Sequence, residues 1–394
     1  MSYVTYDILH GTRGQVPAPA PTLTPGSAAG QASGPTAVRS AWPVADAHND
    51  LLMLVQHFAA DRDYFRRAWL PQLRAGQVGI QVLPVFVDES WLPELALRQT
   101  LALIETALRT VESCADDLAL CLEPGDVEQA LADGRIAVVL ALEGCPAVGP
   151  DTDLLRTLSR LGVRMASLTH FGRNFLADGS AEDGTYGRLT RAGVSAVKVM
   201  QETGMLVDVS HLSLAGTRHV LDITRAPVLA THSSCRALHE HHRNLPDAEL
   251  RAIAATGGVV GINFFPAFLS PGPGTIDLVL DHIEHAVGQA GIEHVGLGPD
   301  FTKEIASTMY AGSHVMEGID LAAAVPGLEG PADLPVLAGR LAARGFSPAD
   351  VAAVLGGNLR RLLNSSIGSG GAIGGAAIDA TAAAGGGAVP GGGP

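Results

Sequence analysis

Side chains that can bind a metal ion or transfer a proton stand at the ends of short apolar runs in this sequence. There are eight such runs, and seven of them end in, or immediately before, a residue of this kind or one that can hydrogen-bond a substrate. These residues are His48, Asn49, Asp50, Glu143, His170, His211, His232, Asn263 and Asp300. The chain has 14 histidines, and chance would not place four of them at such positions. The pattern predicts one site assembled from many strand ends.

Five of these residues have the types and spacing of metal ligands. His48 and Asp50 are two apart, so on a strand both side chains point to the same side and can bind one ion. A His-x-Asp pair alone is weak evidence for a metal site, because such pairs are common in turns. Glu143 closes a run of seven apolar residues, where a carboxylate is costly to bury unless it is paired or bound to a cation. His211 and His232 close successive runs; each alone suggests a structural histidine, but together with the others they favour a metal site.

These five ligands can hold two ions if Glu143 bridges them. Bridged ions lie about 3.5–4 Å apart, and a water between them becomes a nucleophile near neutral pH. Imidazole and carboxylate ligands without thiolate suit zinc, although manganese, iron or cobalt fit the same ligands. Five ligands shared by two ions leave coordination positions open, as in catalytic rather than structural zinc sites. We therefore predict two divalent ions, with Zn²⁺ as the first choice.

The runs that carry these residues are spaced like the strands of an α/β protein with a (β/α)8 TIM barrel. They cover 42–50, 78–87, 135–144, 163–172, 204–213, 226–234, 257–266 and 294–301. Helix-like segments such as 92–108 and 247–255 alternate with them. Runs that are apolar throughout indicate strands buried on both faces, and eight units over about 320 residues match a TIM barrel. A doubly wound open sheet is the alternative, but the Gly-rich turn of a dinucleotide-binding domain is missing after the first run.

Composition and charge narrow the class of protein. The 394 residues are 47% hydrophobic and carry a net charge of −14. That composition is ample for a large core, and the negative charge argues against nucleic acid or an anionic membrane as a partner. No apolar stretch approaches the length of a membrane span. Segments 1–40 and 365–394 are rich in Pro, Gly and Ala, so we expect both to be disordered and 41–364 to form the barrel domain.

The expected cellular location is the cytoplasm. The N-terminus lacks the basic start and apolar run of a secretory signal. The four cysteines, Cys114, Cys121, Cys145 and Cys235, form no C-x-x-C pair. That pattern fits reduced cysteines that are buried as small apolar residues.

A series of motifs follows in order along residues 44–364. They are DAHNDLL (46–52), ALEG (141–144), LTHFGRNFLADG (168–179), GMLVDVSHLS (204–213), THSSCRALHEHHRNLPD (231–247), GVVGINFF (258–265) and GGNLRRLL (356–363). In order and spacing the chain resembles the membrane (renal) dipeptidases, a metallopeptidase family of the amidohydrolase-like barrels. The resemblance implies that His48 and Asp50 bind one ion, that His211 and His232 bind the other, and that Glu143 bridges them.

The resemblance also implies roles for three residues that bind or transform the substrate. His170 would polarise the scissile carbonyl, Arg243 would clamp the substrate carboxylate with its planar fork, and Asp300 would carry a proton from water to the leaving amine. The sequence departs from the family at Phe265, where members often carry Tyr, and at Thr302-Lys303, where they often carry Asp-Gly. These departures concern the choice of substrate rather than the metal ligands.

The leading hypothesis is a zinc-dependent dipeptidase, and the resemblance implies tolerance for a D-residue at the C-terminal side of the substrate. A hydrolase of another amide, ester or lactam in a small-molecule pathway is the alternative enzyme. A metal-stabilised scaffold with vestigial chemistry is disfavoured, because every proposed ligand, His170 and Asp300 are present. The expected partner is a small dipeptide or dipeptide-like substrate, with no nucleic acid and no membrane; a homodimer is an open alternative to a monomer.

Overall fold

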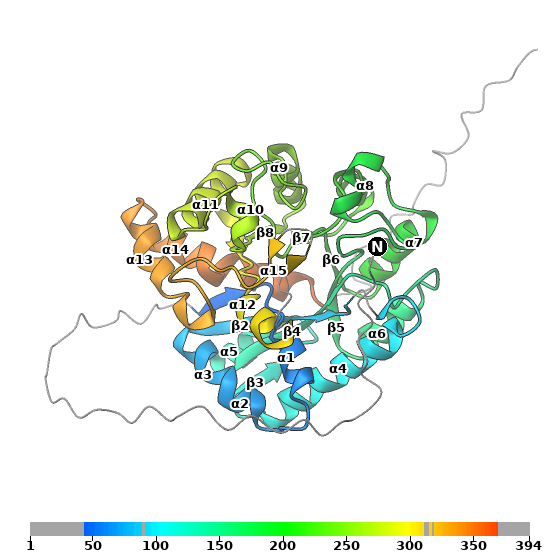
Figure 1. Ribbon diagram of the computed structural model, residues 1–394, viewed down its shortest axis with the longest axis horizontal. Coiled ribbons are helices and arrows are strands. Elements are labelled where there is room, and N and C mark those ends of the chain that lie inside the picture. The colour runs from blue at the N-terminus through cyan, green and yellow to red at the C-terminus, as the bar shows by residue number, and fades with distance from the viewer. Residues whose placement is uncertain (1–42, 89–90, 311–314, 317–318, 369–394) are drawn as a thin grey trace, which may run out of the picture. The chain divides into compact units, whose positions relative to one another are not determined.

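A closed barrel of eight parallel strands lies at the centre of the computed structural model, which describes residues 43–88, 91–310, 315–316 and 319–368 (Figure 1). The barrel strands are β1 (Val44–Asp46), β2 (Val78–Phe86), β4 (Ile136–Glu143), β5 (Val163–Ser167), β6 (Leu206–Asp208), β7 (Val228–Ala230), β8 (Val259–Ile262) and β9 (Val295–Leu297). The barrel closes because β1 pairs with both β2 and β9, and β2 pairs with β4. Each predicted run contains one of these strands, so the predicted TIM barrel is confirmed and the open-sheet alternative is wrong.

Three short strands lie outside the barrel. Strand β3 (Leu118–Leu120) pairs with the first residues of β4, beside the place where β5 pairs with the later ones. Strands β10 (Val315–Met316) and β11 (Ile319–Asp320) form an antiparallel pair. None of these was predicted, because two or three residues are too few to show a pattern.

Helices surround the barrel. They are α1 (Leu51–His57), α2 (Tyr64–Ala68), α3 (Leu70–Ala75), α4 (Ala96–Ser113), α5 (Asp126–Ala132), α6 (Leu154–Arg160), α7 (Arg191–Glu202), α8 (Leu214–Ile223), α9 (Asp247–Ala255), α10 (Pro266–Leu269), α11 (Ile276–Ala290), α12 (Lys303–Met309), α13 (Val336–Ala343), α14 (Pro348–Ala352) and α15 (Asn358–Ser366). The predicted helix 247–255 is α9, whereas the predicted helix 92–108 is α4, which starts and ends later. It continues past 108 because Leu108 and Val111 pack against the core.

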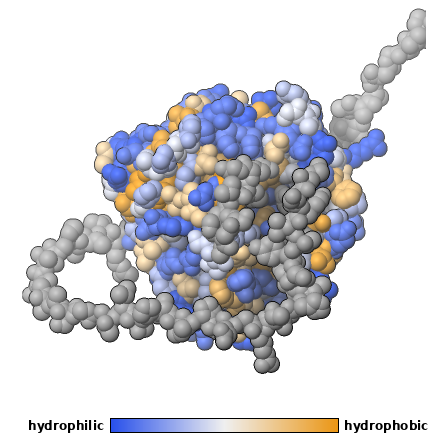
Figure 2. Space-filling view, viewed as in Figure 1, coloured by the Kyte–Doolittle hydropathy of each residue, from blue (hydrophilic) through white to orange (hydrophobic). Residues whose placement is uncertain are grey.

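The outside of the described structure shows no membrane-spanning element. No described helix combines the length and the apolar character that crossing a bilayer requires. The face in Figure 2 is mostly hydrophilic where it is coloured, with scattered hydrophobic residues. All four cysteines lie among the described residues and are buried and unpaired, as the sequence predicted.

Alternation along the strands separates two apolar layers and fixes the direction of Glu143. In β4, Ala137, Val139 and Ala141 belong to a cluster of residues from the barrel strands, whereas Val138, Leu140 and their alternate neighbours pack in the outer layer against the helices. Side chains in a strand alternate with a period of two. The residue that continues the inward series is Glu143, so the last position of β4 directs a carboxylate into the barrel mouth.

Helix α15 closes the opposite end of the barrel. Its residues Leu359, Leu362 and Leu363 join the inner cluster, and Asn358 Nδ2 donates to the carbonyl of Val295 at the start of β9 (2.7 Å). The helix extends two residues beyond the expected domain end at 364, and Ile367 is also buried. The segments expected to be disordered, 1–40 and 365–394, lie outside the described residues except for 365–368.

Candidate metal centre

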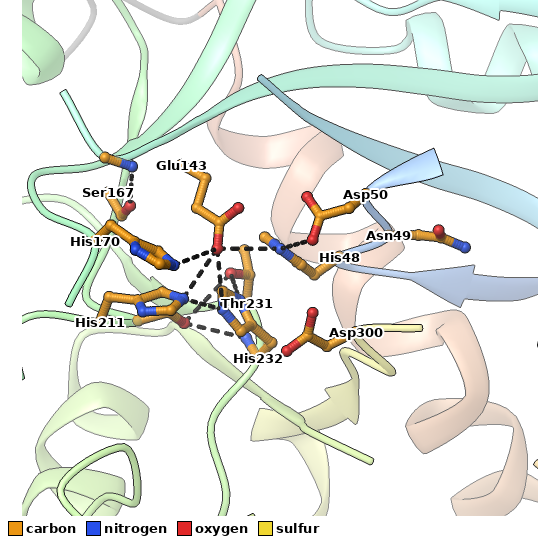
Figure 3. Close-up of polar contacts among 12 residues, drawn as sticks. His48, Asn49, Asp50, Glu143, Ser167, His170, His211, Thr231, His232 and Asp300 are labelled. Carbon is orange, nitrogen blue, oxygen red and sulfur yellow. Dashed lines mark hydrogen bonds and ion pairs between the residues drawn. The ribbon is translucent and has the colours of Figure 1, made fainter. Parts of the chain in front are cut away.

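The C-terminal ends of the barrel strands bring the predicted site residues together. They follow or end β1, β4, β5, β6, β7 and β9, and are His48, Asp50, Glu143, His170, His211, His232 and Asp300 (Figure 3). The site is buried; the exposed fraction of Glu143 is 7% and that of His232 is 1%. The convergence expected from the strand-end pattern is therefore present in the structure.

One carboxylate oxygen, Glu143 Oε1, is at the centre of this group. It lies 2.9 Å from His211 Nε2, 3.5 Å from His48 Nε2 and 3.7 Å from His232 Nε2. His170 Nε2 is 4.0 Å away. His48 Nε2 is also 3.8 Å from Asp50 Oδ2 on its other side. A carboxylate with one oxygen in reach of histidines from several strands can bind a cation together with them.

The polar atoms of the centre satisfy one another only in part. His211 Nε2 and His232 Nε2 face each other at 2.8 Å. Among the described residues, the buried atoms His48 Nε2 and Asp50 Oδ1 have no hydrogen-bond partner. Buried polar groups are normally paired, and buried charges are normally compensated. Nitrogen and oxygen ligand atoms packed in this way fit divalent cations. Three overlapping groups of the site residues have ligand atoms close enough together to hold a metal ion.

Burial and neighbouring charges shift the pKa values of the site histidines in different directions. Burial lowers the pKa of His211 and of His232 well below the usual value, and nearby cationic groups lower it further. Burial alone would also lower the pKa of His48, but the carboxylates of Glu143 and Asp50 outweigh it and raise that pKa. The lowered pKa of His211 and His232 favours the neutral imidazole, which is the form that binds a metal.

A hydrogen-bond chain fixes the tautomer of His232. Thr231 Oγ1 donates to Asp208 Oδ2, and His232 Nδ1 lies 2.8 Å from the same hydroxyl oxygen. Because the hydroxyl proton is engaged by Asp208, the oxygen accepts the proton of Nδ1. The lone pair of His232 is then on Nε2, which faces Glu143. Through Thr231, Asp208 therefore supports the orientation of a candidate metal ligand.

Two of the site residues have strained backbones. His211 has a φ of 66° and Asp300 a φ of 58°, a left-handed region that residues other than glycine rarely occupy. Backbone hydrogen bonds hold both: Ser180 N donates to the His211 carbonyl (2.7 Å), and Asp300 N donates to the His48 carbonyl (3.1 Å). Strain of this kind gathers at functional sites, where the surrounding structure imposes it.

Neighbouring polar residues hold the turns that carry the ligands. Asp46 Oδ1 accepts from the backbone N of His48 (3.0 Å), and Asn49 Nδ2 donates to Asp46 Oδ2 (3.3 Å). Burial raises the pKa of Asp46 to about 7. Asn263 Nδ2 donates to Asp300 Oδ2 (2.9 Å). Asn49 and Asn263, both found at strand ends in the sequence, therefore act as hydrogen-bonding supports.

Arg243 is a buried cation without a described anionic partner. Its exposed fraction is 3%, and its guanidinium lies 5.4 Å from the ring centre of Phe268 and 5.9 Å from that of Phe171. Nη2 donates to the His232 carbonyl (3.1 Å), but Nε has no hydrogen-bond partner among the described residues. Burial lowers the pKa of Arg243 to about 10. A buried guanidinium is costly without a counter-charge, so an anionic group within its reach would be stabilised.

A cleft of about 670 Å³, including its open mouth, lies over the centre. Its polar floor is Asp50, Glu143, His170, His211 and Asp300, and its apolar walls are Met53, Phe86, Phe171, Phe265, Phe268, Ile305, Ala306, Tyr310 and Leu321. Thr302 also lines it. Two positions at which the sequence departs from the family it resembles, Phe265 and Thr302, therefore face this cleft. The walls were not predicted, because an apolar residue after a strand looks the same in sequence whether it faces the core or a ligand. The one available signal was position, since Phe86 stands at the end of a predicted strand and Phe171 directly follows the predicted site residue His170.

Comparisons with known proteins agree on one family. The family model described as Membrane dipeptidase (Peptidase family M19) matches residues 35–367. Dipeptidase aclJ of Aspergillus oryzae is 33% identical over 343 residues, which are 82% of this chain and 77% of that protein. Dipeptidase verJ of Clonostachys rogersoniana is 36% identical over 271 residues, which are 68% of this chain and 66% of that protein.

A solved structure shares the fold. It is a metallopeptidase from Rhodobacter sphaeroides bound to a phosphinate mimic of the dipeptide L-Ala-D-Ala. Its TM-score is 0.72 and its sequence identity 23%, over 82% of this chain and 99% of that chain. The match over nearly all of that chain agrees with the closed barrel described above.

Proposed function

This chain belongs to the membrane dipeptidase family of metallopeptidases, and on that premise we propose that it hydrolyses small dipeptides with a free carboxylate, using two divalent ions that we take to be zinc. Membership of this family implies peptide-bond hydrolysis that depends on a divalent metal. The zinc identity, the number of ions and the individual residue roles are our proposal. The observation that carries it is the position of Glu143 Oε1, within 2.9–3.7 Å of three imidazole nitrogens.

Each ligand has a proposed place in this centre. His48 and Asp50 would hold one ion, His211 and His232 the other, and Glu143 would bridge them. Bound there, the two ions would supply an activated bridging water as the nucleophile. Glu143 and the neutral imidazoles suit this arrangement, because a bridge needs full negative charge and the terminal ligands need free lone pairs.

The remaining residues would position the substrate and move protons. His170, beside the ligands, would donate to the carbonyl oxygen as its negative charge grows. Burial raises the pKa of Asp300, so this carboxyl can hold a proton taken from water and deliver it to the leaving amine. A C–O bond forms, the C–N bond breaks, and the proton moves from the water to the new amine.

Arg243 would bind the carboxylate at the C-terminal end of the dipeptide. Its burial and its orphaned Nε support this role. We extend the proposal to dipeptides with a D-residue at that end, supported by the relative that holds a mimic of L-Ala-D-Ala. We also propose a cytoplasmic location, supported by four buried, unpaired cysteines.

The test compares a dipeptide with its C-terminal amide. A charge-assisted pair contributes about 1.5–3 kcal/mol, so kcat/KM should favour the acid by roughly ten- to a hundred-fold. Arg243→Ala should lose most of that preference, and Arg243→Lys should recover little because a point charge lacks the bidentate geometry. Arg188→Ala, which removes an exposed arginine paired with Asp222, serves as the control and should keep the wild-type preference. Equal rates on acid and amide in the wild type would favour a hydrolase of another amide, ester or lactam instead.

A further inference from the structure

One part of the cleft wall lies beside Asp50 and is apolar. Met53 is in α1, three residues after Asp50, and Ile305 belongs to α12. Phe86 ends β2, and Tyr310 follows α12. We call these four residues the upstream wall. All of them line the cleft over the metal centre.

Tertiary contacts hold the upstream wall in place. Helices α1 and α12 pack against each other, and Figure 1 shows them close together near the barrel mouth. Tyr310 Oη donates to Asp88 Oδ2 (3.1 Å), and the Phe86 ring lies 4.8 Å from the His170 ring. Ile305 is buried with an exposed fraction of 4%. The wall is therefore preformed, which reduces the entropy that a ligand loses when it binds there.

Two other apolar residues of the cleft separate it from Arg243, which lies buried behind them and does not line the cleft itself. Phe171 and Phe268 lie against its guanidinium, and the Phe171 ring is 4.9 Å from the ring of His211. A dipeptide spans only about 7 Å of backbone. With its carboxylate at Arg243 and its scissile carbonyl at His170, its N-terminal residue would reach the end of the cleft marked by Asp50 and Met53.

We infer that the preferred dipeptide carries a large apolar side chain on its N-terminal residue, and that this side chain packs against the upstream wall. The inference rests on the proposed function, because it takes the substrate carboxylate to bind at Arg243. A leucine or phenylalanine side chain would leave water for an apolar surface. An acidic side chain would lose its hydration against this apolar surface without gaining a partner there. A glycine would leave the wall exposed to water.

The first experiment measures kcat/KM of the metal-loaded full chain on two series of dipeptides. In the series Phe-Gly, Leu-Gly, Ala-Gly, Gly-Gly and Glu-Gly, the first two should exceed Gly-Gly and Glu-Gly by roughly ten-fold or more. In the reversed series, Gly-Phe should gain clearly less over Gly-Gly than Phe-Gly does. Equal rates across the first series, or an equal gain for Gly-Phe, would overturn the inference and leave the dipeptidase proposal standing. No hydrolysis of any dipeptide would instead overturn the proposed function.

The second experiment assigns the preference to the wall. Met53→Ala should reduce the ratio of kcat/KM for Leu-Gly over Gly-Gly by several-fold, because it removes part of the apolar surface. Met309→Ala truncates a methionine of α12 that does not line the cleft, and should leave the ratio and the activity as in the wild type. Circular dichroism melts check that both variants fold. An unchanged ratio in folded Met53→Ala would show that the preference arises elsewhere, and the wild-type series stands as a test if a variant does not fold.

Discussion

The two ends of the barrel are built from the same strands but are completed in opposite ways. At the N-terminal end, leucines of α15 fill the opening, and the polar Asn358 at the start of that helix donates to two backbone carbonyls at 2.7 Å. At the C-terminal end, buried atoms of His48, Asp50 and Arg243 have no hydrogen-bond partner among the described residues. The first end is filled by apolar side chains of the protein itself. The second has buried charges that cations and an anionic substrate would compensate.

The backbone shows the same difference. At the N-terminal end, which α15 closes, Gly356 lets the backbone of Pro43 approach closely. A Cβ at this position would lie 2.3 Å from the Pro43 carbonyl oxygen. A small residue is used where packing needs one. At the open end, His211 and Asp300 occupy the left-handed region although neither is glycine. The side chains are kept there in spite of the backbone cost, which indicates that the chemistry of these residues decides the sequence at the mouth.

The largest expected effect is the loss of activity in Glu143→Gln. Bound metal ions supply several kcal/mol of transition-state stabilisation, and a neutral amide cannot bridge two cations, so kcat/KM should fall by about 10³-fold or more. The melting temperature of the metal-free protein should change little. Glu128→Gln, at the closed end beside Arg360, is the matched control and should retain activity. Near-native turnover with two bound ions in Glu143→Gln would show that this residue is not the bridge.

Leu362→Ala should have the converse effect at the closed end. Leu362 is fully buried, and truncation of a buried leucine costs about 2–5 kcal/mol of unfolding free energy. Denaturant unfolding of the metal-free protein measures this loss, while elemental analysis measures the metal bound per folded chain, which should not change. A variant that loses metal but keeps its stability would contradict the division between the two ends.

The sequence predicted the parts of this division that depend on strand periodicity. Strand ends and apolar runs identified the barrel, and alternation along β4 explains why Glu143 faces inward. The apolar walls were not predictable, because Met53 and Ile305 have the same character as core residues. The role of Thr231 was not predictable either, since it depends on Asp208 from the neighbouring strand β6.

Thr231→Val should weaken metal binding by roughly 10–100-fold, the usual effect of losing a hydrogen-bond partner of a metal ligand. Valine keeps the shape of threonine but cannot accept the Nδ1 proton of His232, so the tautomer with a free Nε2 loses its support. Competition with a chromophoric chelator measures the affinity without any assay of activity. Thr217→Val, at a buried threonine of α8, is the control, and its affinity should match the wild type. Equal affinities in the two variants would remove the proposed role of Thr231.

The smallest effect is expected from trimming the chain to residues 41–368, which keeps Ile367 in the closed end. The composition of the removed segments does not favour packing, so the melting temperature should shift by less than about 2 °C and kcat/KM should stay unchanged. A large drop in either quantity would show that one of these segments contributes to the fold or the site.

The central claim is that the open end of the barrel is completed by two divalent ions. Elemental analysis of the purified full chain, before and after dialysis against a strong chelator and with dipeptide hydrolysis followed in parallel, tests it most directly. We predict about two equivalents of zinc per chain, lost together with activity on chelation and restored together when zinc is returned. Trace metal in an active preparation, with hydrolysis unaffected by the chelator, would contradict the account.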